Sequence, residues 1–361
     1  ERKMASIKTK DKKINVLTYN SNVKYRAKQT GLIEMRRFLF RNMLLLFIKI
    51  LTNISRGERM KSVFIGECMV ELSTLDGGLL QKSFAGDIFN SAVYMKRLMQ
   101  EKCDVSVLTA IGEDQVSTEM EAFFKRQGLG TDTVCKSSDG TVGFYMISTD
   151  DTGERSFSYW RESSMARRLM HILKNAKTTL DSLNADMIFF TGITLAILDL
   201  KSRKDLLNQI SAARKNGAKI AFDPNYRHQL WENKETAADW IDKAYQVSDT
   251  IFPSVEEESG LFNTASTKDC LSRLVKYGIK EIVLKAGTEG MYVQNNGELF
   301  HRAFIPADKV VDTTAAGDSF DGSYLAMRMR GKNVQESLDH AAEVAAKVVT
   351  FPGAIMPEGL T

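Results

Sequence analysis

The sequence contains few of the residues that hold metals or form disulfides. Its 361 residues include only four cysteines, Cys68, Cys103, Cys135 and Cys270, which are far apart and form no CxxC pair. This spacing fits neither a zinc site nor a disulfide framework. The four histidines form no HExxH or similar cluster, so they are better explained as structural or exposed residues than as metal ligands. Because no signal peptide is recognisable, we expect a cytoplasmic protein in a reducing environment.

Long apolar runs and the common phosphate-binding loop are also missing. The only solid apolar run, residues 43–48, is bracketed by Arg41 and Lys49. It is much shorter than the roughly 20 residues that a membrane-spanning helix needs, and we expect no membrane partner. The pattern GxxxxGK[ST] does not occur, which excludes a P-loop. No internal repeat or low-complexity linker divides the chain.

Charge is unevenly distributed along the chain. Residues 1–60 carry 15 Lys and Arg against 4 Asp and Glu, whereas the remainder carries 34 against 41. The excess of basic residues therefore belongs to the first segment, and we expect no nucleic-acid partner for the main body. We interpret residues 1–59 as a basic leader outside the core, either mistranslated upstream sequence or an appended tail, because a buried-type strand begins directly after Met60. A surface-bound amphipathic helix in the leader is the alternative.

From Met60 onward, short apolar runs alternate with stretches of helical periodicity. Strands are predicted at 62–66, 105–110, 187–191, 219–223, 250–253 and 281–285, and helices at 90–100, 113–127, 196–216, 267–277 and 341–350. Such alternation predicts an α/β fold, a doubly wound and mostly parallel sheet, over residues 60–361. Residues 70–84 and 141–161 instead resemble hairpins. They predict a small β-sheet lid that stands off the main sheet.

Residues 312–322, DTTAAGDSFDG, are the most informative stretch for function. Small residues are followed by Phe320, Tyr324 and Met327 at helical spacing, which predicts a loop entering a helix N-terminus. Unpaired amides and the helix dipole make such a terminus a site for an anion such as phosphate. Asp318 would place a carboxylate beside that anion. Two negative charges repel each other, so this placement needs a reason, and a general base for an attacking hydroxyl supplies one. The alternative is that Asp318 only caps the helix.

Polar residues follow several predicted strands, at the edge where open parallel sheets bind ligands. They are Glu67 after the first strand, residues 223–227 (DPNYR), and residues 285–290 (KAGTEG). Arg227 offers a planar fork suited to a carboxylate, and Arg161, in the lid segment, offers a second cation near substrate or phosphate. Two simpler explanations remain open: Asp223 and Arg227 pair only with each other, and Gly287 and Gly290 only shape a turn.

Together, these motifs resemble the PfkB, or ribokinase-like, family of sugar kinases from Met60 to the C-terminus. The resemblance implies ATP and Mg²⁺ as cofactors, with K⁺ as a further candidate, and phosphoryl transfer to a sugar hydroxyl. Glu257, in a segment where Ser254 replaces the usual Asn, would act on Mg²⁺ through water. The resemblance assigns catalysis to Ala315, Ala316, Gly317 and Asp318; substrate binding to Gly86, Asp87, Asn90, Tyr145, Tyr159, Arg161, Arg227 and Asp318; and nucleotide binding to Asn225, Arg227, Lys285, Gly287, Gly290, Ala315 and Gly317.

Residues 66–72, 153–161 and 223–231 resemble the sugar-acid branch of the family, the 2-keto-3-deoxygluconate kinases. We therefore expect transfer to the C6 hydroxyl of that sugar acid, giving its 6-phosphate and ADP. A sugar acid and ATP would be the partners, together with a second copy of the chain bound through the lid sheet. The alternatives are a fructokinase or ribokinase, which would not need Arg227, and a non-catalytic sugar-binding regulator on the same fold.

Removal of residues 1–59 should leave the fold and the kinase activity intact, because the strand pattern begins only after Met60. Circular dichroism and an ADP-release assay on the shortened and full-length proteins check this expectation. A shortened protein that is insoluble, or folded but inactive, would show that the leader belongs to the enzyme.

Overall fold

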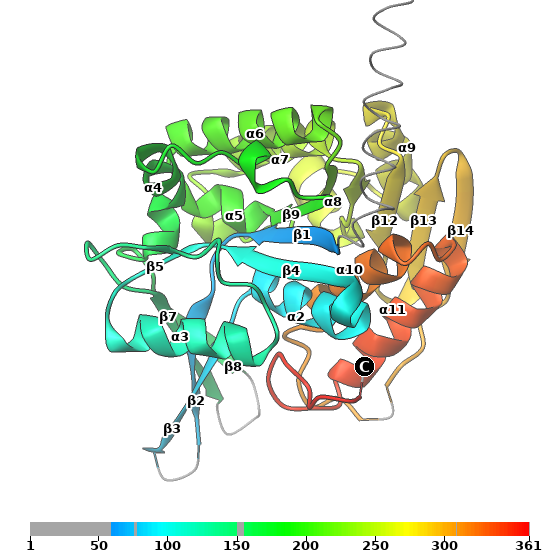
Figure 1. The fold of residues 1–361 in the computed structure, drawn as a ribbon. Coiled ribbons are helices and arrows are strands. Elements are labelled where there is room, and N and C mark those ends of the chain that lie inside the picture. Colours follow the sequence, from blue (N-terminus) through cyan, green and yellow to red (C-terminus); the bar gives the residue numbers. More distant parts are fainter. Residues whose placement is uncertain (1–58, 76–77, 150–154, 308, 361) are drawn as a thin grey trace, which may run out of the picture. The chain divides into compact units, whose positions relative to one another are not determined.

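An eight-stranded sheet organises the part of the chain that the structure describes, a computed structural model of residues 59–75, 78–149, 155–307 and 309–360 (Figure 1). The expectations for residues 1–58 lie outside this part. The strands of the sheet are β1 (Met60–Ile65), β4 (Cys103–Leu108), β9 (Met187–Thr191), β10 (Lys219–Asp223), β11 (Thr250–Ile251), β12 (Glu281–Lys285), β13 (Met291–Asn295) and β14 (Glu298–Arg302).

The order of the strands explains where ligands can bind. The order is β14-β13-β12-β11-β10-β9-β1-β4, and β12 through β4 are parallel, whereas β13 and β14 are antiparallel additions at one edge. The chain therefore builds outward from β1 in both directions, as in a doubly wound sheet. All parallel strands end on the same side, so Glu67, Asp223 and Lys285 come together at one edge. The predicted fold class is confirmed.

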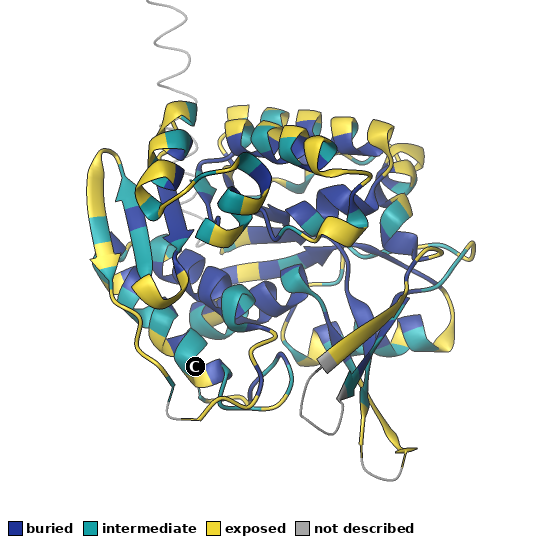
Figure 2. Ribbon diagram, turned by 180° about the vertical axis from the view of Figure 1, so that it is seen from behind, coloured by how far each residue is buried: buried dark blue, intermediate teal, exposed yellow. Residues whose placement is uncertain are grey.

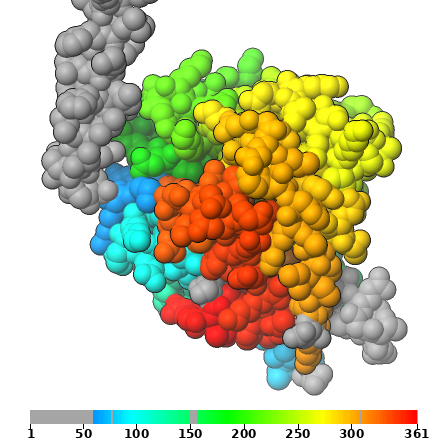
Figure 3. All heavy atoms as spheres, turned by 90° about the vertical axis from the view of Figure 1, so that its right-hand side faces the viewer, coloured from blue at the N-terminus to red at the C-terminus, as the bar shows by residue number. Residues whose placement is uncertain are grey.

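Helices cover both faces of this sheet, and each layer is fixed by a continuous apolar core. One face carries α4 (Leu169–Asn175), α5 (Gly192–Ile197), α6 (Leu200–Lys215), α7 (Lys234–Val247), α8 (Val255–Phe262) and α9 (Thr267–Leu274). The other carries α2 (Asp87–Met99), α3 (Gln115–Arg126), α10 (Ala316–Met329) and α11 (Val334–Val348). The sides of the helices that face the sheet are buried and the opposite sides are exposed (Figure 2). In the space-filling view, the C-terminal helix lies beside the β13–β14 edge (Figure 3).

The lid is a separate four-stranded sheet. It consists of β2 (Met69–Thr74), β3 (Leu80–Ala85), β7 (Gly143–Thr149) and β8 (Arg155–Trp160), in the order β3-β2-β7-β8. The outer pairs are antiparallel and the central pair, β2 with β7, is parallel, so two hairpins are joined side by side. A short two-stranded sheet, β5 (Ala110–Ile111) with β6 (Cys135–Lys136), lies apart from both.

Some predicted boundaries were wrong. Residues 196–216 were expected to form one helix, but the chain breaks between α5 and α6, where the Asp199 side chain accepts a hydrogen bond from the Ser202 amide and caps the second helix. The final helix, which residues 341–350 were expected to continue, begins at Val334, where Asn333 and Glu336 form a capping box, and ends at Val348. Helix α7 and the β13–β14 hairpin were not expected.

Helices α2 and α10 pack closely because Gly322 has no side chain. A Cβ atom at Gly322 would lie 2.1 Å from the carbonyl oxygen of Ser91, on the facing helix. No real Cβ approaches a backbone oxygen so closely, so any larger residue would push the helices apart. This contact matters for function, since α2 carries Asp87 and Asn90 and α10 carries Asp318.

Gly322→Ala should lower the free energy of unfolding by about 1–3 kcal/mol, the usual cost of overpacking a rigid contact. Gly260→Ala is the matched control, since Gly260 also lies within a helix but has open space around the added methyl group. That control should gain about 0.5–1 kcal/mol from helix propensity. Urea unfolding followed by circular dichroism measures both, and equal shifts in the two variants would contradict the packing argument.

Candidate active site

The loop after β10 brings the strand end close to α2. The Asn225 amide donates to Asp223 Oδ1 at 3.1 Å, which tightens the turn, and the Asn225 side chain donates to Asp87 Oδ2 at 3.0 Å. Thr191, at the end of β9, donates its hydroxyl to the same Asp87 oxygen at 2.6 Å. Asp87 is therefore held by two strand ends. Burial raises the pKa of Asp87, and the hydrogen bond from Thr191 opposes that rise.

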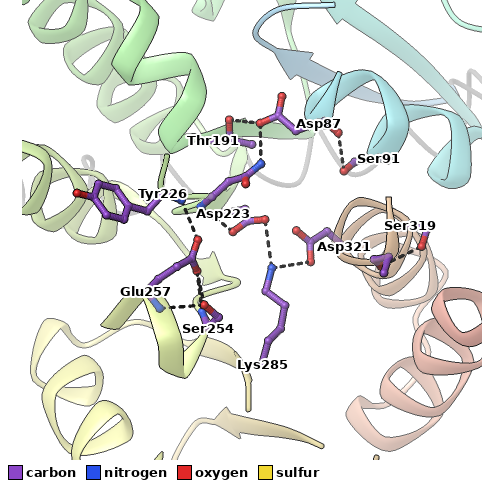
Figure 4. Close-up of polar contacts among 12 residues, drawn as sticks. Asp87, Ser91, Thr191, Asp223, Tyr226, Ser254, Glu257, Lys285, Ser319 and Asp321 are labelled. Carbon is purple, nitrogen blue, oxygen red and sulfur yellow. Dashed lines mark hydrogen bonds and ion pairs between the residues drawn. The ribbon is translucent and has the colours of Figure 1, made fainter. Parts of the chain in front are cut away.

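A buried group of charges lies between β10, β12 and α10 (Figure 4). Lys285 Nζ lies 3.2 Å from Asp223 Oδ2 and 3.7 Å from Asp321 Oδ1. Burial by itself lowers the pKa of Lys285, but Asp223, Asp321 and Glu257 outweigh burial and raise it. Burial raises the pKa of Asp321, and Lys285 opposes this. Within the described residues, Asp223 and Arg227 form no ion pair with each other: Asp223 pairs with Lys285, and Arg227 Nη1 donates to the Tyr226 carbonyl at 3.1 Å.

The N-terminus of α10 lacks a capping side chain. Its N-cap residue is Ala315, and Asp312 instead fixes the preceding loop by accepting hydrogen bonds from the Thr314 amide and hydroxyl and from the Gly353 amide. The Ala316 amide donates to Thr313 at 3.2 Å, whereas the amides of Gly317 and Asp318 have no acceptor among the described residues. Those two amides are free to bind an anion, as the sequence predicts for this helix start, and their role toward a phosphate stays a prediction.

Asp318 does not cap this helix. Its Oδ2 accepts a hydrogen bond of 2.8 Å from the Asn90 side chain, across the α2–α10 contact. Burial and the nearby charge of Asp87 raise the pKa of Asp318 to about 7, and the Asn90 hydrogen bond opposes the rise. A carboxylate with a pKa near neutrality, beside two unpaired amides, has the properties of a general base.

A cavity of about 340 Å³ lies between the lid and this edge of the main sheet. Its lining residues are Glu67, Met69, Gly86, Asp87, Tyr159, Arg161, Glu162, Arg167, Ile193, Arg227, Gln229 and Leu230. Asp318 lies near this cavity, because it accepts a hydrogen bond from Asn90, which follows the lining residue Asp87 by one turn of α2. The structure thus brings together most of the residues that were expected to bind a substrate.

Two expected substrate residues have other contacts. The Tyr145 hydroxyl donates to Glu71 inside the lid sheet, and Tyr145 does not line the cavity. Arg161 lines the cavity, but its guanidinium forms a buried ion pair with Glu67. Tyr159 does line the cavity and stacks on Tyr145 with ring centroids 5.9 Å apart. Tyr145 and Arg161 therefore both have partners within the protein, and their role toward a substrate stays a prediction.

Glu257 is engaged by the chain on both of its carboxylate oxygens. Oε1 accepts from the Tyr226 amide at 2.8 Å, and Oε2 accepts from the Ser254 amide and hydroxyl at 2.9 and 2.8 Å. Burial raises the pKa of Glu257. Within the described residues, no group of three or more His, Cys, Asp and Glu side chains could hold a metal ion.

The glycines after β12 shape the backbone. Gly290 has φ +93° and lies so close to the next hairpin strand that a Cβ atom would be 2.1 Å from the Arg302 carbonyl oxygen. Gly287 has φ +55° and open space around it. Both glycines therefore serve the turn, and their role toward a nucleotide stays a prediction. No helix in the described ranges is long and apolar enough to span a membrane.

Four residues of the site were missed by sequence reasoning: Glu67 as the partner of Arg161, Thr191, Arg167 and Asp321. Thr191 could have been found, since it is a polar residue at the end of an apolar strand, like Asp223. Asp321 is one helical turn beyond Asp318 and shares its helix face, which is a weak signal. Nothing in the sequence around Arg167 indicates that it faces a cavity.

Comparisons with known proteins agree with this geometry. The model of the "pfkB family carbohydrate kinase" matches residues 60–358. The chain is 37% identical over 297 residues to the 2-dehydro-3-deoxygluconokinase of Dickeya dadantii (strain 3937), covering 81% of this chain and 96% of that protein. Among solved structures, the 2-dehydro-3-deoxygluconokinase of Thermotoga maritima has a TM-score of 0.70 at 20% identity, covering 83% and 95%. The ATP-bound fructokinase of Xylella fastidiosa has a TM-score of 0.66 at 20% identity, covering 82% and 93%.

An α/β sheet with a sheet lid, and with a buried carboxylate beside an uncapped helix N-terminus at its carboxyl edge, is the arrangement expected of a small-molecule phosphotransferase. The chain belongs to the pfkB family of carbohydrate kinases. The resemblance drawn from its motifs is thereby confirmed.

Asp318→Asn keeps the size of the side chain but cannot accept a proton, so kcat should fall by about 10²–10⁴ with little change in substrate or ATP affinity. In the wild type, kcat/KM should fall as the pH drops through about 7, because protonation removes the base. The variant should lack that dependence. Steady-state rates between pH 5.5 and 9 test this, and near-wild-type turnover would exclude Asp318 as the base.

Proposed function

We propose that the protein is an ATP-dependent 2-dehydro-3-deoxygluconokinase. It phosphorylates the C6 hydroxyl of 2-keto-3-deoxygluconate, which is another name for 2-dehydro-3-deoxygluconate. The products are the 6-phosphate and ADP. The observation that carries this proposal is the position of Asp318. It lies beside two unpaired helix amides and next to a cavity lined by arginines. The sequence identity of the chain to proteins named 2-dehydro-3-deoxygluconokinase supports the choice of substrate.

Asp318 would accept the proton of the C6 hydroxyl as that oxygen bonds to the γ-phosphorus and the bond to the ADP oxygen breaks. The amides of Gly317 and Asp318 would stabilise the charge on the transferred group. Lys285 Nζ lies 3.9 Å from the position of a Cβ atom on Gly317, so an ammonium group stands beside the same anion site. Asn225, Gly287 and Gly290 remain candidate nucleotide residues near these strand ends.

The described residues fit a magnesium ion that enters with the nucleotide. Mg²⁺ is commonly held by substrate phosphates and one or two carboxylates with several waters, rather than by a protein cage. Glu257, whose oxygens are satisfied by the chain, would act on such an ion only through water. When bound, the ion would neutralise charge on the phosphates. We keep K⁺ as a candidate without a site.

The lid sheet is the proposed contact with a second copy of the chain. It exposes an unusual number of large apolar side chains: Leu79, Leu80, Phe157, Tyr159 and Trp160 are each between 44% and 66% exposed. Such a surface on a monomer would be costly to leave in water. A homo-oligomer formed through this sheet would cover the side chains and stiffen the lid.

The substrate assignment predicts selective damage by Arg227→Ala. Arg227 lines the cavity with its guanidinium free of any acidic partner among the described residues. A bound carboxylate loses water and needs such a charge, so its loss should lower kcat/KM for 2-keto-3-deoxygluconate by roughly 30-fold to several thousand-fold. Residual activity toward fructose or ribose should change far less.

An ADP-release assay with sugar acids and neutral sugars, on the wild type and Arg227→Ala, tests this. Equal losses on both kinds of substrate would mean that Arg227 is structural or serves ATP. A wild type that phosphorylates neutral sugars in preference would favour a fructokinase or ribokinase, and one that phosphorylates nothing would favour a binding regulator.

A further inference from the structure

A groove between α4 and α6 gathers positive charge on the face of the main sheet opposite to α2 and α10 (Figure 1). Its volume is about 550 Å³, and it shares no lining residue with the cavity beneath the lid. The residues that line this α4–α6 groove are Met170, His171, Lys174, Lys177, Thr178, Thr179, Lys201, Ser202, Lys204, Asp205, Asn208 and Gln209. The wall thus contains four lysines and one aspartate, although residues 61–361 carry 34 Lys and Arg against 41 Asp and Glu.

The four lysines of the groove are not paired. None of them forms a side-chain hydrogen bond or an ion pair within the described residues. Asp205 follows Lys201 by one turn of α6, but its Oδ2 accepts a hydrogen bond from the Gln209 side chain at 3.2 Å. Helical lysines elsewhere differ: Lys125 and Lys243 each form an ion pair with an acidic residue one turn away. The α4–α6 groove therefore holds uncompensated positive charge.

The acidic residue at the start of α6 does not neutralise this charge. Asp199 Oδ1 accepts a hydrogen bond from the Ser202 amide at 2.9 Å, and its Oδ2 accepts one from the Ser202 hydroxyl at 3.0 Å. The same Oδ2 lies 2.7 Å from His171 Nε2. Asp199 is therefore committed to the helix start and to His171, and the lysine charges of the groove stay available to a ligand.

Helix stability does not account for all four lysines. Lys174 is in the last turn of α4, where the helix dipole favours a cation. Lys201, however, is in the first turn of α6, where the dipole favours negative side chains and where no acidic residue occurs. Lys204 follows Lys201 on the same helix. Like charges gathered in one concave surface repel each other, so the arrangement is unfavourable in the free protein and attracts anions.

The lysines and the size of the groove indicate the class of ligand. An ammonium group is a compact charge with three rotatable donors, which suits phosphate oxygens, whereas planar carboxylates are matched by arginine, and the groove has none. A volume of about 550 Å³ fits a small molecule. Helix α4 has seven residues and is about 10 Å long, too short to follow a nucleic acid over the roughly six phosphates that such binding involves.

We propose that the α4–α6 groove is a second binding site, for a small molecule that carries clustered phosphate groups. Nucleoside triphosphates and sugar bisphosphates share this chemistry. The neutral polar side chains of the groove, such as Thr178 and Asn208, can donate and accept hydrogen bonds with the rest of either molecule. The inference does not depend on which sugar the active site phosphorylates.

Acetylation of lysine side chains by an N-hydroxysuccinimide ester, followed by mass spectrometry, tests each lysine of the full-length protein separately. Inorganic tripolyphosphate is the first probe, at about 0.15 M ionic strength. If each groove lysine contributes as much as a good exposed ion pair, half-maximal protection should occur on the order of 1 mM. Lys215 and Lys219, which are exposed and lie outside the groove, should stay unprotected. Equal protection of those two, or none in the groove, would overturn the proposal.

A pair of double variants separates the site from net charge. Lys174→Gln with Lys204→Gln should raise the half-protecting concentration at the two remaining groove lysines by roughly 10-fold to 30-fold. Lys215→Gln with Lys219→Gln, the matched control, removes the same charge outside the groove and should change that concentration by less than about twofold. Circular dichroism checks that both proteins are folded. Equal shifts in the two would mean that net charge alone attracts the probe, which would overturn the site.

Three further probes identify the source of the phosphates, and the wild-type protein decides their outcome if a variant does not fold. ATP and fructose 1,6-bisphosphate represent the two small-molecule sources, and a single-stranded RNA oligonucleotide represents a macromolecule. Protection of the groove lysines by either small molecule supports the proposal and assigns the source. Protection by tripolyphosphate alone would indicate an adventitious ion only, and protection by RNA alone would indicate a nucleic-acid surface. Either result would overturn the proposal.

Discussion

The ammonium group of Lys285 is the charge on which the arrangement of the site depends. It lies between Asp223, at the end of β10, and Asp321, on α10. Removing carboxylates from water costs several kcal/mol per ion unless a partner compensates for it. Lys285 supplies that compensation for two elements at once, so it joins the sheet edge to the helix whose N-terminus has the two unpaired amides. Without it, both carboxylates would be left buried and uncompensated.

The parallel strands could be predicted well because they are buried on both faces. The apolar runs of β9, β10 and β12 have the residue limits expected from the sequence. The antiparallel edge was missed although a signal existed: Asn296 and Gly297 both have positive φ, as a tight hairpin turn requires, and Asn-Gly is the strongest short hairpin signature. The break before α6 likewise depended on one capping residue, Asp199, inside an otherwise helical pattern.

For the site, sequence reasoning found residues at strand ends and at the helix N-terminus, where position in the fold follows from local pattern. It could not find contacts that arise only from tertiary packing. The pairing of Glu67 with Arg161 joins residues 94 positions apart, and Asn90 reaches Asp318 across 228 positions. Such contacts decide which charges are free. A cation identified from sequence can therefore be neutralised in the fold, as Arg161 is, while an unremarked one such as Arg167 remains unpaired.

Lid strand β3 leads directly into helix α2, so the lid is linked to the residues around Asp318. Only Gly86 separates the last residue of lid strand β3 from Asp87, the first residue of α2, and Asn90 follows one turn later. Burial and then the charge of Asp87 raise the pKa of Asp318, and the Asn90 side chain donates a hydrogen bond to its Oδ2. The lid strand and the side chains that influence Asp318 therefore lie on one continuous stretch of backbone. A substitution that moves β3 is expected to alter the surroundings of the Asp318 carboxylate as well.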